Sequence, residues 1–217
     1  MTTAVSASPI DGTVVLLQVD DLCFAYPSRP LFAHLCAAFT PGLYLVCGDD
    51  GNGKTSLLRL LAGDLPAQSG RLQIGEFLLS DDAPAYRRQV FRTDPASEAF
   101  EQWTPMAWFA QLLERYPAFD MALAAQLLEQ LFLSPHLDKT GHMMSTGSRR
   151  KVWLVAALAS CAPVVLIDQP FAALDTPSIR VVTELLQQSA QQPGRVIVLA
   201  DYEVPNDLQL NGRIALD

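Results

Sequence analysis

The sequence is poor in positive charge: 15 lysine and arginine residues stand against 23 aspartate and glutamate residues, and the formal net charge is −8. A surface that binds nucleic acid needs clustered basic side chains, so this balance argues against a nucleic acid partner. The one run of three basic residues is Arg149-Arg150-Lys151. A run of this length is typical of a solvated helix face and does not by itself indicate such a surface.

Cysteine is also scarce. The four cysteines form no CxxC pair, and this usage is typical of reduced thiols in a cytosolic protein. We expect most of them to be buried, because two lie in strongly apolar surroundings. They are Cys23, Cys36, Cys47 and Cys161.

Long apolar runs are absent as well. The longest, residues 152–167, is interrupted by Ser160 and Pro163 and is shorter than the roughly 20 residues that span a bilayer. Residues 1–12 lack the basic start and apolar run of a signal peptide and read as a polar tail. We therefore expect a cytoplasmic protein that reaches the face of a membrane only through other chains.

The chain of 217 residues, half of them hydrophobic, suits one domain with a sizeable core. Apolar runs predict strands at 14–19, 43–47, 71–74, 90–91, 164–167, 196–199 and 213–216. Helix-start signals predict helices at 54–62 and from near Thr104, Asp120 and Thr176. Strands that alternate with helices indicate an α/β fold with a mainly parallel core sheet, into which residues 95–160 insert a helical stretch.

A phosphate-binding loop is the strongest motif. The pattern G-x-x-x-x-G-K-[ST] predicts that backbone N–H groups of the loop point at phosphate groups, that the lysine reaches the β- and γ-phosphates, and that the following hydroxyl ligates Mg²⁺. It follows a predicted strand and opens a predicted helix, which is the context that the motif requires. Its residues are Gly48, Asp49, Asp50, Gly51, Asn52, Gly53, Lys54 and Thr55, with Ser56 behind them.

Two further features are weaker when taken alone. Asp168 ends the apolar run 164–167, and a carboxylate at the tip of a buried strand can hold Mg²⁺ through its water shell. Residues 144–148 are a Ser/Gly-rich helix start that contains Ser145 and Gly147. Such a start is another place where N–H groups meet an anion, although it also fits an ordinary N-cap.

Taken together, these residues resemble the ABC ATPase family over nearly the whole chain. The phosphate loop is similar to its Walker A motif, Asp168 to its Walker B aspartate, and residues 144–148 to a divergent form of its LSGGQ signature. Ala173-Leu174-Asp175 resembles the D-loop. Tyr26 lies where the family places an aromatic ring against adenine, although a strand aromatic in the core is the alternative.

The resemblance implies a P-loop NTPase fold of the ABC cassette type, in one domain over 1–217. Residues 1–94 and 161–217 would form the core with an antiparallel β part, and 95–160 the helical signature subdomain. It implies binding of Mg-ATP between two cassettes, identical or different, with Ser145 and Gly147 of one touching the γ-phosphate held by the other.

Transmembrane permease subunits are the remaining partners that the resemblance implies. The surface that couples to them would lie around residues 92–103 and the helical insert. Four aromatic residues are candidate contacts there, with core packing as the alternative for each: Phe100, Trp103, Trp108 and Phe109.

Three positions depart from the family pattern. Gln169 replaces the glutamate that polarises the attacking water, and losing a general base typically slows a reaction by about 10²–10⁴-fold. Asp201 stands where the family has a histidine facing the γ-phosphate, and Thr93 where it has the Q-loop glutamine. Asp49 and Asp50 add negative charge to the phosphate loop, and an aspartate close to a phosphate repels it unless protonated or turned away.

We therefore expect strong ATP binding and weak hydrolysis. Gln169 reflects either natural divergence or an engineered change, and the departures at Thr93 and Asp201 favour divergence. Two functions remain open: an ATP-binding subunit that drives transport across a membrane, and a non-catalytic regulatory subunit that pairs with an intact cassette.

Overall fold

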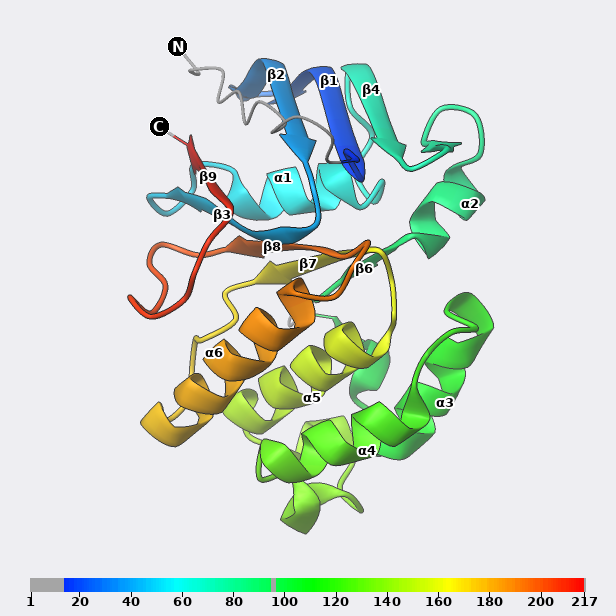
Figure 1. The fold of residues 1–217 in the computed structure, drawn as a ribbon, viewed down its shortest axis with the longest axis vertical. Helices are drawn as coiled ribbons and strands as arrows, with labels where there is room; N and C mark the ends of the chain where they lie inside the picture. Colours follow the sequence, from blue (N-terminus) through cyan, green and yellow to red (C-terminus); the bar gives the residue numbers. More distant parts are fainter. Residues whose placement is uncertain (1–13, 95–96, 217) are drawn as a thin grey trace.

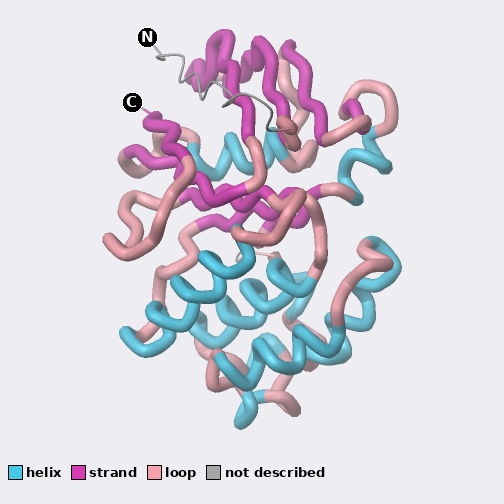
Figure 2. The backbone as a smooth tube through the Cα atoms, viewed as in Figure 1, coloured by secondary structure: helices cyan, strands magenta, loops and turns pink. Residues whose placement is uncertain are grey.

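The protein is described by a computed structural model, which covers residues 14–94 and 97–216. The polar tail expected over residues 1–12 and the start of the helical insert at Pro95 lie outside these residues. Figure 1 shows the chain as stacked layers, with an antiparallel sheet above helix α1 (Lys54–Leu61), a parallel sheet below it, and the remaining large helices beneath. Figure 2 shows the strands in the upper half, with α1 and α2 (Ala83–Arg88) among them, and the other α-helices in the lower half.

The parallel sheet is the centre of the molecule. Its strand order is β6-β7-β8-β3-β9, and each neighbouring pair is parallel. One face packs on α1 and the antiparallel sheet, and the other packs on the helices. A sheet covered on both faces needs strands that are apolar throughout, which explains the apolar runs in the sequence. The strands are β3 Gly42–Gly48, β6 Val90–Arg92, β7 Val164–Asp168, β8 Val196–Ala200 and β9 Gly212–Leu216.

The antiparallel sheet has the order β2-β1-β4-β5. Asp21, with φ of 52°, makes an irregularity in β1, so that Val19 and Leu22 both face the core although they are three residues apart. The prediction at 14–19 was therefore displaced, and β2 was not predicted. The strands are β1 Leu17–Tyr26, β2 Arg29–Phe39, β4 Ser69–Ile74 and β5 Phe77–Leu78.

Only helices lie between β6 and β7 among the described residues, which confirms the expected fold class with a helical insert. No helix of the described residues is long and apolar enough to cross a membrane. The α-helices are α1 Lys54–Leu61, α2 Ala83–Arg88, α3 Pro105–Arg115, α4 Met121–Gln130, α5 Thr146–Ala159 and α6 Thr176–Ala190. The short 3-10 helices are Glu98–Phe100, Ser134–His136 and Gly141–Met143.

The predicted helix starts are correct in position, but their capping differs. Asp120 caps α4 as expected, since its side chain accepts a hydrogen bond from the N–H of Leu123 at 2.8 Å. Thr104 is the N-cap residue of α3, but its hydroxyl makes no capping bond. Asp175 rather than Thr176 caps α6, by accepting from the N–H of Ser178.

The cysteines are all free thiols, as expected. The expectation that most are buried was wrong: Cys36 and Cys161 are exposed, and Cys23 and Cys47 are half-buried. Cys161 has a φ of 54° directly after α5, so it lies in the turn that leads to β7 rather than in the apolar layer on either side.

Gly70 provides a test of the irregular β1–β4 pairing. Its φ is +107°, and a Cβ there would lie 2.6 Å from the Cα of Leu22, whereas a Cβ on Gly75, with φ +55°, would meet nothing within 4 Å. Gly75→Ala is expected to cost about 1 kcal/mol for its left-handed backbone. Gly70→Ala adds a backbone clash, so we expect it to lower the free energy of unfolding by about 2 kcal/mol more. Urea unfolding of the two variants measures the difference, and equal costs would contradict the tight approach.

Candidate functional site

The phosphate loop lies between the end of β3 and the start of α1. Gly51 and Gly53 have φ of 81° and 93°, conformations that glycine adopts without strain. Lys54 is buried, and its Nζ donates to the carbonyls of Gly48 at 2.7 Å and Asp49 at 2.9 Å. The ammonium group therefore lies across the loop at the N-terminus of α1, where backbone N–H groups and a fixed cation favour an anion.

Asp168 and Thr55 meet beside this loop. The hydroxyl of Thr55 donates to Oδ2 of Asp168 at 2.6 Å, although 113 residues separate them. Both present oxygen atoms, the ligand type that Mg²⁺ prefers. A pocket of about 170 Å³ lies over them, and it is lined by Asp50, Gly51, Gly53, Lys54, Thr55, Ser56, Asp168 and Gln169.

Tyr26 and Arg29 approach the loop from the antiparallel sheet. The hydroxyl of Tyr26 lies 3.2 Å from Oγ of Ser56, and its partly exposed ring packs edge-on against Phe24. Arg29 donates to the carbonyl of Gly51 at 2.9 Å and lies 3.4 Å from Oδ1 of Asn52. An exposed ring beside the loop is free to stack on a base, whereas Arg29 holds the loop backbone.

Gln169 and Asp201 lie at the ends of β7 and β8. Gln169 has a φ of 48°, is exposed, and is held through its main chain, with its N–H donating to the carbonyl of Ala200 at 2.7 Å and its carbonyl accepting from Arg150. Burial raises the pKa of Asp201 above its ordinary value, and the charge of Asp168 raises it further, while the N–H of Tyr202 and the charge of Arg150 act in the opposite direction.

Ser145 and Gly147 do not line this pocket. Ser145 is the N-cap residue of α5, where its Oγ accepts from the N–H of Ser148 at 3.1 Å. A Cβ on Gly147 would lie 2.5 Å from the carbonyl oxygen of Ala173, so the helix start packs directly on the loop after β7. Within one chain, the N-cap interpretation of Ser145 is therefore correct.

Thr93, which stands where the family has the Q-loop glutamine, does not line the pocket at the phosphate loop. It is buried, its N–H donates to the carbonyl of Leu166, and its hydroxyl accepts from the N–H of Asp168 at 3.2 Å. Its side chain thus supports the end of β7 rather than lining the pocket. The flanking Arg92 forms ion pairs with Asp64 at 2.8 Å and Asp94 at 3.0 Å.

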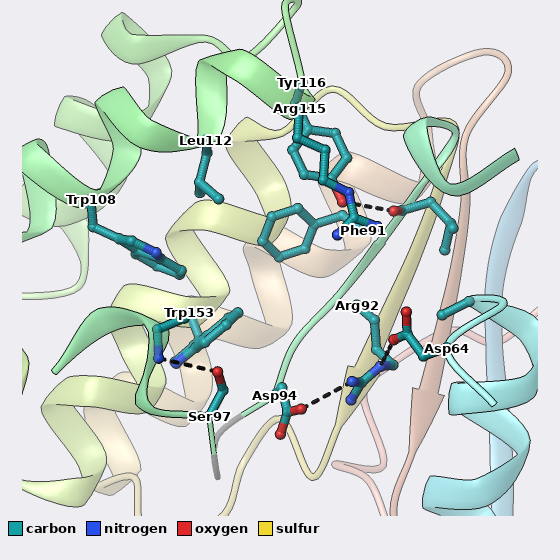
Figure 3. A pocket seen from close by; sticks show the side chains of 13 residues that line it. Asp64, Phe91, Arg92, Asp94, Ser97, Trp108, Leu112, Arg115, Tyr116 and Trp153 are labelled. Carbon is teal, nitrogen blue, oxygen red and sulfur yellow. Dashed lines mark hydrogen bonds and ion pairs between the residues drawn. The ribbon is translucent and has the colours of Figure 1, made fainter. Parts of the chain in front are cut away.

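A larger pocket, of about 350 Å³, lies away from the phosphate loop between the sheet and the helical insert. Figure 3 shows aromatic rings along one side of it and the Arg92 ion pairs on the other. Arg115 donates to the carbonyl of Arg87 and lies 5.3 Å from the centre of the Tyr116 ring, and no carboxylate of the described residues pairs with it. The lining includes Phe91, Trp108, Leu112, Tyr116 and Trp153.

The structure corrects the proposed aromatic contacts. Phe100 and Phe109 are buried in the hydrophobic core, so core packing explains them. Trp108 is also 96% buried, but one part of its ring lines the larger pocket. Trp103 is 43% exposed and remains a candidate surface residue.

Two residues of the site, Arg29 and Arg150, were missed from the sequence, and so was the contact that Thr93 makes. Arg29 reaches the phosphate loop and Arg150 reaches Gln169, in each case through a contact with a residue more than 18 positions away. Thr93 reaches Asp168 across 75 residues. None of them belongs to a phosphate-binding pattern. For Arg150 the sequence did contain a signal, the basic run 149–151, but this run also fitted a solvated helix face.

Comparison with known proteins identifies the family from the sequence and similar folds among solved structures. A family model described as "ABC transporter" matches residues 40–172. The cytochrome c biogenesis ATP-binding export protein CcmA of Zymomonas mobilis is 33% identical, over 86% of this chain and 82% of that protein. The taurine import ATP-binding protein TauB of Pseudomonas entomophila is 29% identical, over 94% of this chain and 79% of that protein.

Among solved structures, an ATP-binding subunit of an ABC transporter superposes with a TM-score of 0.74 at 22% identity, covering 85% of this chain and 79% of the other. A nucleotide-free ATP-binding cassette from an ABC transporter gives 0.67 at 18% identity, covering 87% and 81%. These likenesses establish the fold, and the family match establishes membership. The chain therefore belongs to the ABC transporter family, as an ATP-binding subunit of the P-loop NTPase type.

Proposed function

We propose that the chain binds Mg-ATP at the phosphate loop and drives transport across a membrane as part of a complex with permease subunits. The observation that carries the proposal is the convergence of Lys54, Thr55 and Asp168 on one pocket, with the Thr55 and Asp168 oxygens 2.6 Å apart. Mg²⁺ bound between these oxygens would offset the charge of the β- and γ-phosphates. The exposed ring of Tyr26 would stack on adenine.

The proposed assembly is a head-to-tail pair of cassettes, with an identical or a different chain as the second member. Ser145 and Gly147 lie outside the chain's own pocket, which supports a role toward the nucleotide of a partner. The complex would lie on the cytoplasmic face of the membrane, where permease subunits hold it. No role in nucleic acid binding is proposed.

Hydrolysis by this chain is proposed to be weak. The amide of Gln169 has no basic oxygen comparable to a carboxylate, and Asp201 places a second carboxyl group near Asp168. These two features also support the second candidate function, in which the chain binds ATP without turnover and regulates an intact cassette in a heterodimer.

The pocket beside Arg92 is the proposed docking surface for the permease. Its aromatic lining suits a large apolar side chain, and Arg115, which lacks a carboxylate partner among the described residues, suits an acidic one. The charge of Arg92 is already matched by Asp64 and Asp94. We therefore expect a short amphipathic segment of the partner to fill this pocket.

Lys54→Ala tests nucleotide binding. Hydrogen bonds from a charged donor typically contribute about 1.5–3 kcal/mol, so the variant should bind ATP roughly 10- to 100-fold more weakly. Lys139→Ala, which changes a lysine of the helical insert, is the control and should bind as the unmodified chain does. Calorimetric titration with Mg-ATP measures both affinities, and equal affinities for the two variants would contradict the assignment of the loop.

Gln169→Glu tests the cause of weak hydrolysis. If the missing general base limits the rate, the variant should hydrolyse ATP about 10²-fold faster within the complete complex, with little change in ATP affinity. Phosphate release by the purified complex measures the rate. A rate that stays unchanged would mean that Asp201 or the partner limits turnover, and it would favour the regulatory function.

Leu112→Glu tests the docking pocket. Leu112 lines the pocket, whereas Leu113 beside it is exposed and does not. A carboxylate at position 112 should prevent an apolar side chain of the permease from entering. A tagged Leu112→Glu chain should therefore lose the permease on purification from solubilised host membranes, whereas Leu113→Glu should retain it.

The same purification of the unmodified chain tests the assembly. Recovery of a permease with a second cassette identifies a heterodimer. Recovery of no membrane partner by the unmodified chain would contradict the transport function.

A further inference from the structure

Arg150 connects α5, the signature helix that begins within residues 144–148, to the pocket at the phosphate loop. Its guanidinium extends from the second turn of α5 and donates to the carbonyl of Gln169, the residue that follows Asp168. Its Nε is buried without a partner among the described residues. The side chain therefore reaches beneath the end of β7 instead of lying on a solvated helix face, as the basic run 149–151 had suggested.

Two carboxylates lie at the ends of the neighbouring strands β7 and β8, beside the main chain of Gln169 that Arg150 binds. They are Asp168 and Asp201, and no ion pair of the described residues joins either of them to Arg150. Burial lowers the pKa of Arg150, and the two carboxylates raise it. Among the described residues, the other basic side chains at this pocket are those of Lys54, which is bound to loop carbonyls, and Arg29, which donates to the carbonyl of Gly51.

A second contact fixes the same helix to the same loop. Gly147 and Arg150 are three residues apart and so lie on one face of α5. Gly147 packs on the carbonyl of Ala173, and Arg150 binds the carbonyl of Gln169. Both loop residues have left-handed φ, 60° and 48°. Such conformations persist when neighbouring contacts hold them, and α5 supplies these contacts at both positions.

We infer, on the basis of the Mg-ATP binding proposed above, that Arg150 is a positioning residue that favours a triphosphate over a diphosphate. It would do so by offsetting the charge of Asp168 and Asp201 near the place where the proposed Mg-ATP would put its third phosphate, and by holding the main chain of Gln169. Charge repulsion from two carboxylates acts most strongly on the phosphate nearest to them. A cation behind them lowers this repulsion for ATP and has less effect on ADP. Arg150 thereby also ties the position of the signature helix to the occupied site.

Arg150→Gln and Arg150→Lys separate charge from hydrogen bonding. Glutamine keeps a donor for the Gln169 carbonyl and removes the charge, whereas lysine keeps the charge. The matched control is Arg149→Gln on the adjacent residue, whose guanidinium pairs with Glu101 instead. Dissociation constants for ATP and ADP, with Mg²⁺ and with EDTA, are measured on the purified full chain by calorimetry, and circular dichroism checks that each variant is folded.

The expected result is a selective loss. Arg150→Gln should weaken ATP binding in EDTA by roughly tenfold, because a charged contact is lost, and should weaken ADP binding much less. Mg²⁺ should reduce the difference, since it supplies charge at the same place. Arg150→Lys and Arg149→Gln should keep the ATP-to-ADP ratio of the unmodified chain. Adding Asp201→Asn to Arg150→Gln should restore ATP binding. Asp201→Asn alone should strengthen ATP binding, so this single variant remains a test if Arg150→Gln does not fold.

Other outcomes overturn the inference. Equal weakening of ATP and ADP by Arg150→Gln would make Arg150 a purely structural link between α5 and the loop. If Arg149→Gln weakened ATP binding as much as Arg150→Gln does, the change would be due to the loss of any positive charge in this region and not to Arg150 itself. An unmodified chain that binds no ATP would overturn the proposed function and this inference together, whereas ATP binding that depends on Lys54 but not on Arg150 would overturn the inference alone.

Discussion

The burial of the parallel sheet on both faces is the constraint on which the rest of the structure depends. Alternate side chains of β3, β7 and β8 enter two separate hydrophobic layers, one shared with α1 and one with the helical insert. Polar chemistry therefore has room only where the strands end. Because parallel strands end at the same edge, Gly48, Asp168 and Asp201 come together from positions far apart in the chain. The fold thus gathers carboxylates at the edge where the loop 48–55 also lies, with the ammonium group of Lys54 bound to loop carbonyls and the guanidinium of Arg150 bound to the carbonyl of Gln169.

The nucleotide pocket and the proposed docking pocket meet through one short strand. Thr93 accepts the N–H of Asp168, while Arg92, the preceding residue, lies in the other pocket between Asp64 and Asp94. A shift of β6 relative to β7 would change both pockets at once. The two hydrogen bonds of Thr93 and the two ion pairs of Arg92 thus connect the two pockets, and the coupling energy through them is measurable by double-mutant cycles.

The sequence by itself determined the elements whose signals are local. The apolar runs of β3, β7 and β8 are continuous because both faces are buried, and the glycines and Lys54 of the phosphate loop lie within eight consecutive residues. Asp120 caps α4 through a bond to a residue three positions away. Each of these features is specified by neighbours in the chain, so the buried strands, the phosphate-loop motif, the helix starts and the position of Asp168 could be predicted.

Only the tertiary structure decided the features that depend on pairing across the chain. Strand β2 went unpredicted because it mixes small, polar and apolar residues, and its pairing with β1 includes irregular register. The same absence of a local pattern hid Arg29, Arg150 and the contact of Thr93 with Asp168, because these roles come from atoms contributed by other elements. Whether an aromatic side chain such as Phe109 is buried or exposed likewise follows from which helix covers it, since its sequence neighbourhood is the same in either case.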